Sequence, residues 1–290
     1  MKKKINISSI LIYSIVVLCV LVTILPFINI IAVSFSSYEA YLDNPMRLIP
    51  KNLNLSAYKE ILGNKLLYSS YTNTIIVTIC TIFLSLFIYV TGAYSLSRKG
   101  LKGKGIFMTL IVFTMMFNGG IVPNYYLIKS LNLYNSLWAL IFTGSFSAFN
   151  LILMKNFFES LPTALIEAAK IDGAMEPTIL FRIVLPLSKP ILATIALYTA
   201  VGSWNNFFNA VIYIKDTSKW PLMLLLREIV MGASMQEIAA GGNILETADK
   251  TQPIMLQYAT LLIVMVPILC VYPFLQKYFV KGVTVGAVKG

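Results

Sequence analysis

The side chains best suited to polar chemistry lie inside a long apolar stretch, between about residues 187 and 213. Three amides, two hydroxyls and an indole gather there: Tyr198, Ser203, Trp204, Asn205, Asn206 and Asn209. An amide in hydrocarbon is costly unless it is hydrogen-bonded, so three together need an explanation. They could line a path for a polar solute, or they could hold neighbouring helices together. Asn205 and Asn209 are four residues apart and would share one face of a continuous helix, and position favours Asn205 for the path.

A second polar point lies in an earlier apolar stretch, where Asn118-Gly119-Gly120 is followed by Pro123. Glycine and proline so close together predict a break near the outer end of that stretch. Asn118 therefore joins the candidates for a solute path. These candidates are Asn118, Tyr198, Trp204, Asn205 and Asn209.

Residues that do catalytic chemistry are scarce in the chain. It has no histidine, and each of its cysteines (Cys19, Cys80 and Cys270) falls in an apolar stretch, where it is expected to act as a small buried hydrophobe. The sequence contains no metal-ligand spacing, no disulfide framework and no G-x-x-x-x-G-K-[ST] phosphate-binding loop. We therefore predict no catalytic residue, no metal and no cofactor bound by this chain, which disfavours an integral-membrane enzyme.

The elements that must position these residues follow from the low charge content. Of the 290 residues, 58% are hydrophobic and 12% are charged, about half the charge of a typical soluble domain. Crossing a bilayer takes about 20 predominantly apolar residues, and several stretches are long enough. We predict an all-α polytopic membrane protein with a single transmembrane domain over residues 1–290. Its six spans are expected at about 8–35, 70–96, 106–128, 136–155, 187–213 and 253–276.

The distribution of charge predicts the orientation of these spans. If the N-terminus lies inside, the inner segments carry 14 of the 23 Lys and Arg residues but only 4 of the 12 acidic residues. This positive-inside bias predicts that both termini are cytoplasmic. It also accounts for the net charge of +11 without nucleic acid.

Two further features concern the apolar stretches themselves. The run that follows Met1-Lys2-Lys3-Lys4 is too long for the apolar region of a cleaved signal peptide, so we expect an uncleaved first span. The spans hold no charged residue apart from their edges. Ion-coupled transporters usually place ionisable groups within the bilayer, so this absence disfavours a secondary transporter and indicates that energy enters from outside the membrane.

The inner loop between the fourth and fifth spans has a predicted structure of its own. Pro162 lies near the start of a helix, Gly173 is expected to end it, and a second short helix runs from Glu176 to Pro186. The carboxylate of Glu167 could accept a hydrogen bond from an arginine or lysine of a partner. From these features alone, a docking surface and an amphipathic linker on the membrane are equally good interpretations.

The order of residues in this loop resembles the EAA signature of binding-protein-dependent ABC importer permeases, whose spacing E-A-A-x-x-x-G-x9-I-x-L-P is reproduced without a gap. The residues that match it are Glu167, Ala168, Ala169, Gly173, Ile183, Leu185 and Pro186, and Asp172 joins them as a candidate residue for coupling to an ATPase. The resemblance implies a type I ABC importer permease fold in which loop 160–186 is a cytoplasmic coupling helix that transmits the closure of an ATPase. One departure is Ile166, where such permeases often carry a second acidic residue.

The flanking residues resemble sugar permeases of the MalG type. This resemblance rests on Leu161-Pro162, Ile171 to Ala174, Val184 to Leu187, Trp204-Asn205 and the run from Gly282 to Gly290. It implies that the tail at 277–290 enters the ATPase dimer, through Thr284, Gly286, Val288 and Lys289. The runs Gly119 to Pro123 and Leu133 to Leu140 resemble the LplC/YtcP-like branch, which is linked with larger or uronic-acid-containing oligosaccharides.

The resemblance also implies the partners of such a chain. It would be a non-catalytic, multi-pass subunit of the bacterial inner or plasma membrane, paired with a second homologous permease subunit. Two ATPase subunits would bind ATP and Mg²⁺, and an extracellular or periplasmic solute-binding protein would deliver an oligosaccharide. The alternative is a permease of the same fold that imports a non-sugar solute such as a peptide.

Overall fold

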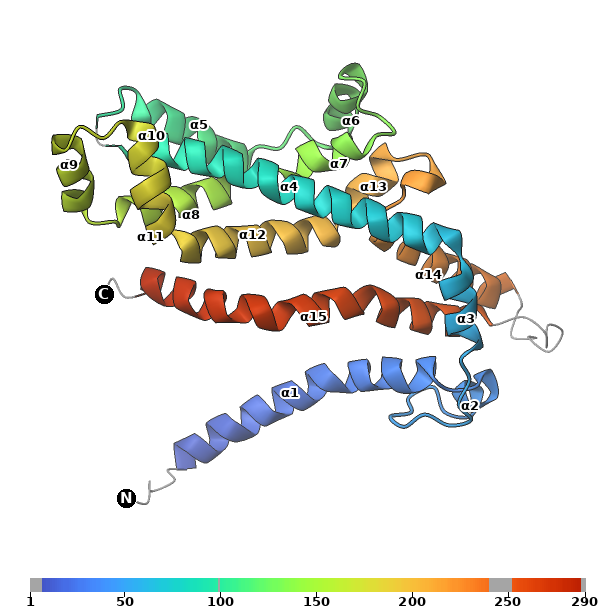
Figure 1. Cartoon of the computed structure of the whole chain (residues 1–290). Coiled ribbons are helices and arrows are strands. Elements are labelled where there is room, and N and C mark those ends of the chain that lie inside the picture. The colour runs from blue at the N-terminus through green and yellow to red at the C-terminus, as the bar shows by residue number, and fades with distance from the viewer. Residues whose placement is uncertain (1–6, 99, 240–251, 288–290) are drawn as a thin grey trace. The chain divides into compact units, whose positions relative to one another are not determined.

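The structure, a computed structural model, describes residues 7–98, 100–239 and 252–287 (Figure 1). It is 79% helix, and the described ranges contain no β-strand, so the prediction of an all-α chain is confirmed. The chain divides into two compact units. The first unit comprises Met1–Leu67 and Leu225–Pro267, and the second unit comprises Tyr68–Leu224 and Ile268–Gly290.

The helices range from single turns to rods long enough to cross a bilayer. In chain order they are α1 (Ile7–Ser34), α2 (Tyr38–Asp43), α3 (Ser56–Gly63), α4 (Lys65–Ser97), α5 (Lys104–Met116), α6 (Ile121–Ser130), α7 (Leu137–Gly144), α8 (Ala148–Glu159), α9 (Thr163–Ile171), α10 (Glu176–Ile179), the π-helical turn η1 (Leu180–Val184), α11 (Leu185–Leu187), α12 (Lys189–Trp204), α13 (Phe207–Tyr213), the 3₁₀ turn η2 (Thr217–Lys219), α14 (Leu222–Ala239) and α15 (Pro253–Ala287).

In the first unit, the loop that follows α2 folds back on the end of α1. The side-chain amide of Asn29 donates to the carbonyl oxygens of Pro45 and Arg47, at 2.9 Å each. Arg47 is itself buried, and its guanidinium donates to the carbonyl oxygen of Ala40. The buried cation is therefore satisfied by backbone acceptors, which fixes the loop against α1 and α2.

The second unit is built along α4 (Figure 1). Toward one end of this helix, Tyr89, Ala93 and Tyr94 pack with α8, α12 and the α9–α11 segment in one buried cluster. Toward its other end, Val77 packs with α6, α7 and α13 in a second cluster. Both ends of the unit are thus attached to a single helix.

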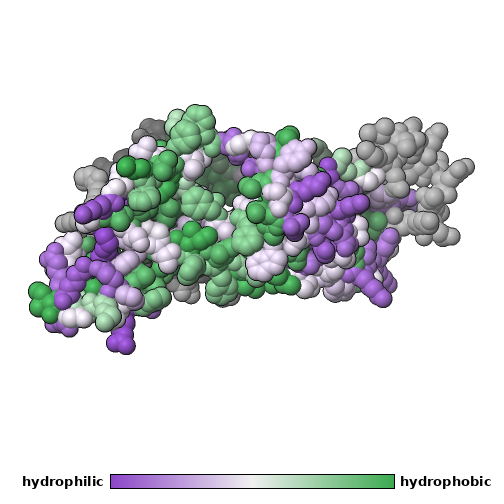
Figure 2. Space-filling model, turned by 90° about the horizontal axis from the view of Figure 1, so that it is seen from above, coloured by the Kyte–Doolittle hydropathy of each residue, from purple (hydrophilic) through white to green (hydrophobic). Residues whose placement is uncertain are grey.

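The candidate membrane spans are of two kinds. Three are straight enough to qualify as single helices: Leu11–Ser34, Lys65–Ser97 and Pro253–Cys270. Three more are helix pairs that meet at a bend, so the described residues contain up to six spans. On the face shown in Figure 2, apolar residues cover a broad area, as expected of a surface that faces lipid.

The break predicted in the third span is present. The α5–α6 pair bends by 115°, and Gly120 at the start of α6 has φ +87°, a conformation that favours glycine. At the other end of the chain, α15 runs on to Ala287, so the predicted tail begins as a continuation of a helix. Thr284 and Gly286 lie on that helix, whereas Val288 and Lys289 lie outside the described residues.

Two spans expected to be continuous are broken. The fourth span bends by 47° between α7 and α8. The helix predicted over 187–213 stops at Trp204 and resumes at Phe207 as α13.

Asparagine side chains account for the break in the fifth span. The amide of Asn205 donates to the carbonyl oxygen of Val201 (2.9 Å), and the side-chain oxygen of Asn206 accepts from the backbone N–H of Asn209 (3.3 Å). Asparagine competes with the helix for backbone partners in this way. The prediction that Asn205 and Asn209 share one face of a continuous helix is therefore wrong.

Candidate functional site

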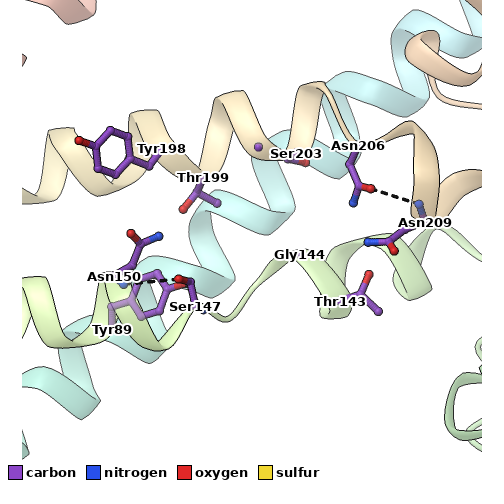
Figure 3. Close-up of a pocket in the computed structure, with 11 residues that line it drawn as sticks. Tyr89, Thr143, Gly144, Ser147, Asn150, Tyr198, Thr199, Ser203, Asn206 and Asn209 are labelled. Atoms are coloured by element: carbon purple, nitrogen blue, oxygen red, sulfur yellow. Dashed lines mark hydrogen bonds between the residues drawn. The ribbon is translucent and has the colours of Figure 1, made fainter. Parts of the chain in front are cut away.

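A pocket lies in the second unit, between the two broken spans (Figure 3). Its volume is about 320 Å³. α12 and α13 form one side, α7 and α8 form the other, and α4 contributes one residue (Figure 3). The lining residues are Tyr89, Thr143, Gly144, Ser147, Asn150, Tyr198, Thr199, Gly202, Ser203, Asn206 and Asn209.

The lining of this pocket is polar but uncharged. Nine of its residues carry a neutral hydrogen-bonding group, and the other two are glycines. In a chain that crosses a membrane, irregular backbone and unpaired polar groups are tolerated where they line a cavity rather than face lipid. Discontinuous helices of this kind form the solute sites of many transporters. The pocket therefore has the composition of a site for a polar, uncharged ligand.

Side chains of α4 hold the break between α7 and α8 in place. The hydroxyl of Tyr89 accepts from the backbone N–H of Ser147 at 2.7 Å, and the hydroxyl of Ser85 donates to the carbonyl oxygen of Ser145 at 2.8 Å. Tyr89 is 1% exposed. The backbone groups that the bend removes from the helix are thus paired with a neighbouring helix.

The loop between α8 and α12 forms a second candidate site. α9 ends in a Schellman turn: Ala174 N–H donates to the carbonyl oxygen of Ala169 (2.9 Å), and Gly173 N–H donates to that of Lys170 (3.1 Å). Gly173 has φ +79°, which explains the glycine at this position. The helix–turn–helix predicted for this loop is therefore present in the structure.

The two faces of this loop have different surroundings. Ala169, Ile179, Leu180 and Val184 are buried in the cluster that includes Tyr94 of α4. Five large apolar side chains of this loop are exposed, and together we call them the outer apolar face. They are Leu165, Ile171, Met175, Phe181 and Leu187. Exposed apolar side chains on a segment that is otherwise well packed indicate a surface for another protein.

A polar link joins α9 to α4. Lys170 Nζ lies 2.6 Å from Glu176 Oε1. The hydroxyl of Tyr94 donates to the Glu176 carboxylate, and the guanidinium of Arg98 lies over the Tyr94 ring, 4.0 Å from its centroid. Hydrogen bonds from Lys170 and Tyr94 hold the pKa of Glu176 below its ordinary value, so its carboxylate is charged at neutral pH.

Comparison with known proteins identifies the kind of protein that carries these features. The profile of the family described as "Binding-protein-dependent transport system inner membrane component" matches residues 60–285. The chain belongs to this family. It is therefore a permease subunit, located in a membrane and without catalytic activity of its own, and the predicted type I ABC importer permease fold is confirmed.

Individual relatives of this permease cover almost all of it. It is 42% identical over 285 residues to the polygalacturonan/rhamnogalacturonan transport system permease protein YtcP of Bacillus subtilis, with 97% of each chain covered. It is also 42% identical to protein LplC of the same bacterium, over 93% of this chain and 90% of that one. A crystal structure of a bacterial ABC transporter involved in the import of the acidic polysaccharide alginate contains a chain with TM-score 0.86 and 34% identity, covering 96% of this chain and 99% of that one.

Some of the residues predicted to line a solute path lie in the pocket, and others do not. Tyr198 and Asn209 line the pocket, whereas Trp204 and Asn205 do not. Asn118 lies at the break between α5 and α6, away from the pocket lining, and its side-chain oxygen accepts from Gly120 N–H at 2.9 Å.

Most of the pocket was not predicted from the sequence. Asn206 was noted but not selected, although it lines the pocket and caps α13. The contributions of Tyr89, Ser147 and Asn150 were missed altogether. The signal for the missed break was the Gly144-Ser145-Phe146-Ser147 run in an apolar stretch, where two serines that favour helix caps follow a glycine.

The signature residues of the permease are distributed over both faces of its loop. Glu167, Ala168, Asp172 and Pro186 are exposed, and Ala169 is buried. Ile183 and Leu185 are partly buried against the cluster around Tyr94, as is Ile166 at the position where an acidic residue is common. An apolar residue fits position 166 here because it packs inward.

Proposed function

We propose that this permease imports an oligosaccharide across the bacterial cell membrane, driven by ATP hydrolysis on partner subunits. The main observation in support is the uncharged hydrogen-bonding pocket in a chain that is 42% identical, over 97% of its length, to a polygalacturonan/rhamnogalacturonan permease. Hydroxyl and amide groups at fixed positions are the chemistry that recognises a polyhydroxylated solute. Complex or uronic-acid-containing oligosaccharides are the candidate substrates.

The α9–α11 segment is the proposed docking surface for an ATPase subunit. Its outer apolar face would be buried against that subunit, and the exposed carboxylate of Glu167 would pair with a cation of the partner. Because the inner side of the segment packs on α4, α8 and α12, a movement of the loop would be passed to these helices. The residues Ala168, Ala169, Asp172, Gly173, Ile183, Leu185 and Pro186 are proposed to shape this coupling element.

The proposed assembly contains a second homologous permease subunit, two ATPase subunits that bind ATP and Mg²⁺, and an external solute-binding protein. The charge bias supports an orientation with both termini in the cytoplasm, where the α9–α11 segment meets the ATPase. The tail residues Thr284, Gly286, Val288 and Lys289 are proposed to enter the ATPase dimer.

The proposed solute path runs along the pocket. Tyr198 and Asn209 are its members with direct structural support, because both line the cavity. Trp204, Asn205 and Asn118 remain proposed members of a longer path beyond the pocket.

The replacement Glu167→Lys tests this function. It should reduce oligosaccharide uptake about tenfold or more in vesicles that hold the reconstituted importer, because reversing a charge in a protein interface typically costs several kcal/mol. Co-purification of the ATPase with the permease should fall in parallel. The matched control is Glu60→Lys, at an exposed carboxylate in α3 of the first unit, which should leave co-purification unchanged.

Two results would contradict the proposal. Normal uptake and co-purification in the Glu167→Lys permease would remove the coupling role from this loop. Uptake of peptides, without uptake of any oligosaccharide, by the wild-type importer would favour the permease of the same fold with a non-sugar substrate.

A further inference from the structure

We infer that the pocket between the two broken spans is a subsite on this subunit itself for an uncharged, hydroxylated sugar ring of the transported chain. The inference rests on the proposed function and adds to it which subunit contacts the solute, at which residues, and which part of the solute is held. It is carried by the size, the lining and the helix breaks of the pocket.

The size of the pocket limits what it can hold. Ligand pockets range over about 300–1,000 Å³, and this one, at about 320 Å³, lies at the small end. It has room for a small part of an oligosaccharide rather than for the whole chain. The remaining rings must therefore lie outside it, along surfaces that this pocket does not include.

The lining supplies donors and acceptors on facing elements. Asn150 of α8 and the pair Asn206 and Asn209 of the α12–α13 break bring side-chain amides to the pocket, and each amide both donates and accepts. Tyr198 adds a phenol ring from α12 (Figure 3). A sugar hydroxyl also both donates and accepts, so a ring with several hydroxyls matches this set.

The charge of the lining determines which sugar ring fits. No Lys or Arg is among the lining residues, so a carboxylate there would meet only neutral hydrogen-bond donors and no opposite charge to offset its desolvation. A uronic acid ring would have to leave water without a cationic partner, whereas a neutral ring has only hydroxyls to satisfy. The pocket therefore selects an uncharged ring, even where other rings of the same chain are acidic.

Gly202 offers a way to fill this pocket without disturbing the fold. It lines the cavity from α12, and a Cβ placed on it meets no atom within 4 Å. A leucine at this position would also favour the helix, since glycine is a poor helix former. Gly232 of α14 is a matched control, because its Cβ likewise meets nothing within 4 Å and it lies outside the pocket lining.

The experiment uses the complete importer in vesicles, with rhamnogalacturonan oligosaccharides as the probe, presented on saturated binding protein. Gly202→Leu should lower the maximal uptake rate about tenfold or more, while the concentration of loaded binding protein at half-maximal uptake and the co-purification of the ATPase stay unchanged. Gly232→Leu should behave as wild type. If the wild-type importer takes up no oligosaccharide at all, the proposed function is wrong. If the wild-type importer takes up the oligosaccharide and the Gly202→Leu and Gly232→Leu permeases have equal maximal uptake rates, only the subsite is overturned.

A second measurement, on the wild-type importer, tests the charge of the bound ring. Rhamnogalacturonan oligosaccharides contain neutral rings, whereas oligogalacturonides consist of uronate rings alone. Presented on loaded binding protein, oligogalacturonides should be taken up about tenfold or more slowly than rhamnogalacturonan oligosaccharides, and equal rates would overturn an uncharged ring at this subsite.

Discussion

Reversing the charge at Glu176 is expected to separate ATP hydrolysis from transport. In the Glu176→Lys permease, we expect uptake to fall about tenfold or more, because hydrogen bonds to a charged group contribute about 1.5–3 kcal/mol. Basal ATP hydrolysis should persist, whereas the stimulation of hydrolysis by loaded binding protein should be lost. The measurement is ATPase activity and uptake of the same reconstituted importer.

The physical reason is the position of Glu176 between two helices. Its carboxylate accepts from Lys170 of α9 and from Tyr94 of α4, so it ties α9, part of the proposed docking surface, to the longest described helix of the second unit. A lysine would instead bring three cations together, beside Lys170 and Arg98. The loop should still fold, because Ile179 is fully buried and anchors α10 in the core.

Three variants serve as controls for this prediction. Glu176→Gln keeps an acceptor for both partners and should reduce uptake by about threefold or less, since exposed ion pairs are worth about 0–1 kcal/mol. Tyr94→Phe keeps the ring under Arg98 but loses the hydroxyl, and it should have an intermediate effect. Glu228→Lys reverses the charge of a similarly exposed, ion-paired carboxylate on α14, and it should leave uptake and the stimulation of ATP hydrolysis unchanged. If the Glu176→Lys and Glu228→Lys permeases show equal coupled transport, the link of Glu176 to Lys170 and Tyr94 is not a coupling element.

The pH dependence of this link follows from the lowered pKa of Glu176. A carboxyl whose pKa is depressed in the folded state contributes stability above its unfolded pKa and loses it as the pH falls through the folded value. That loss lies below the ordinary value of 4.5. The link should therefore be intact throughout the neutral range, and any change in coupling between pH 6 and 8 must come from other groups.

Much of the fold was accessible from composition and helix signals alone. Long apolar stretches predicted α1, α4 and α15, because no soluble element needs so many apolar residues without charge. Gly119-Gly120 predicted the break in the third span, since glycine gives the φ of +87° at Gly120 without strain. Pro162 and Gly173 predicted the limits of α9 for the same kind of local reason.

The breaks that form the pocket depend on contacts that are distant in sequence. Serine and asparagine are tolerated inside membrane helices, so Ser147 and Asn206 do not by themselves signal a break. What stabilises the first break is the pairing of Ser147 with Tyr89, 58 residues earlier. Rules that use only neighbouring residues cannot identify such a partner. Because a continuous helix was predicted over 187–213, Asn205 rather than its neighbour Asn206 was favoured for the solute path.

The link at Glu176 was missed for a related reason. The sequence showed a carboxylate at the start of a short helix, which is explained by the helix dipole alone. Its partners Tyr94 and Arg98 lie on and just beyond α4, 82 and 78 residues earlier in the sequence. Both the pocket and this link thus depend on hydrogen bonds from α4, made by Tyr89 and Tyr94. In the sequence these are single polar groups within a long apolar stretch, so neither indicates its partner.

Removal of one hydroxyl from α4 should therefore destabilise the permease measurably. The replacement Tyr89→Phe keeps the ring, including its contact with Phe146, but leaves the N–H of Ser147 without its partner. The lost hydrogen bond is part-buried and lies at the wall of the pocket, so the cost should be that of a typical intramolecular hydrogen bond, about 0.5–1.5 kcal/mol. Since 1 kcal/mol corresponds to roughly 2–4 °C in a chain of this size, thermal unfolding in detergent should shift downward by about 1–6 °C.

The matched control for this effect is Tyr126→Phe, which removes the same hydroxyl from an exposed tyrosine of α6. Its ring contact with Tyr125 is retained, and its unfolding temperature should stay close to that of wild type. Equal unfolding temperatures for Tyr89→Phe and Tyr126→Phe would contradict the argument. A lower temperature for Tyr89→Phe alone would mean that the broken span, and with it the shape of the pocket, depends on a hydrogen bond from α4 rather than on the sequence of the break.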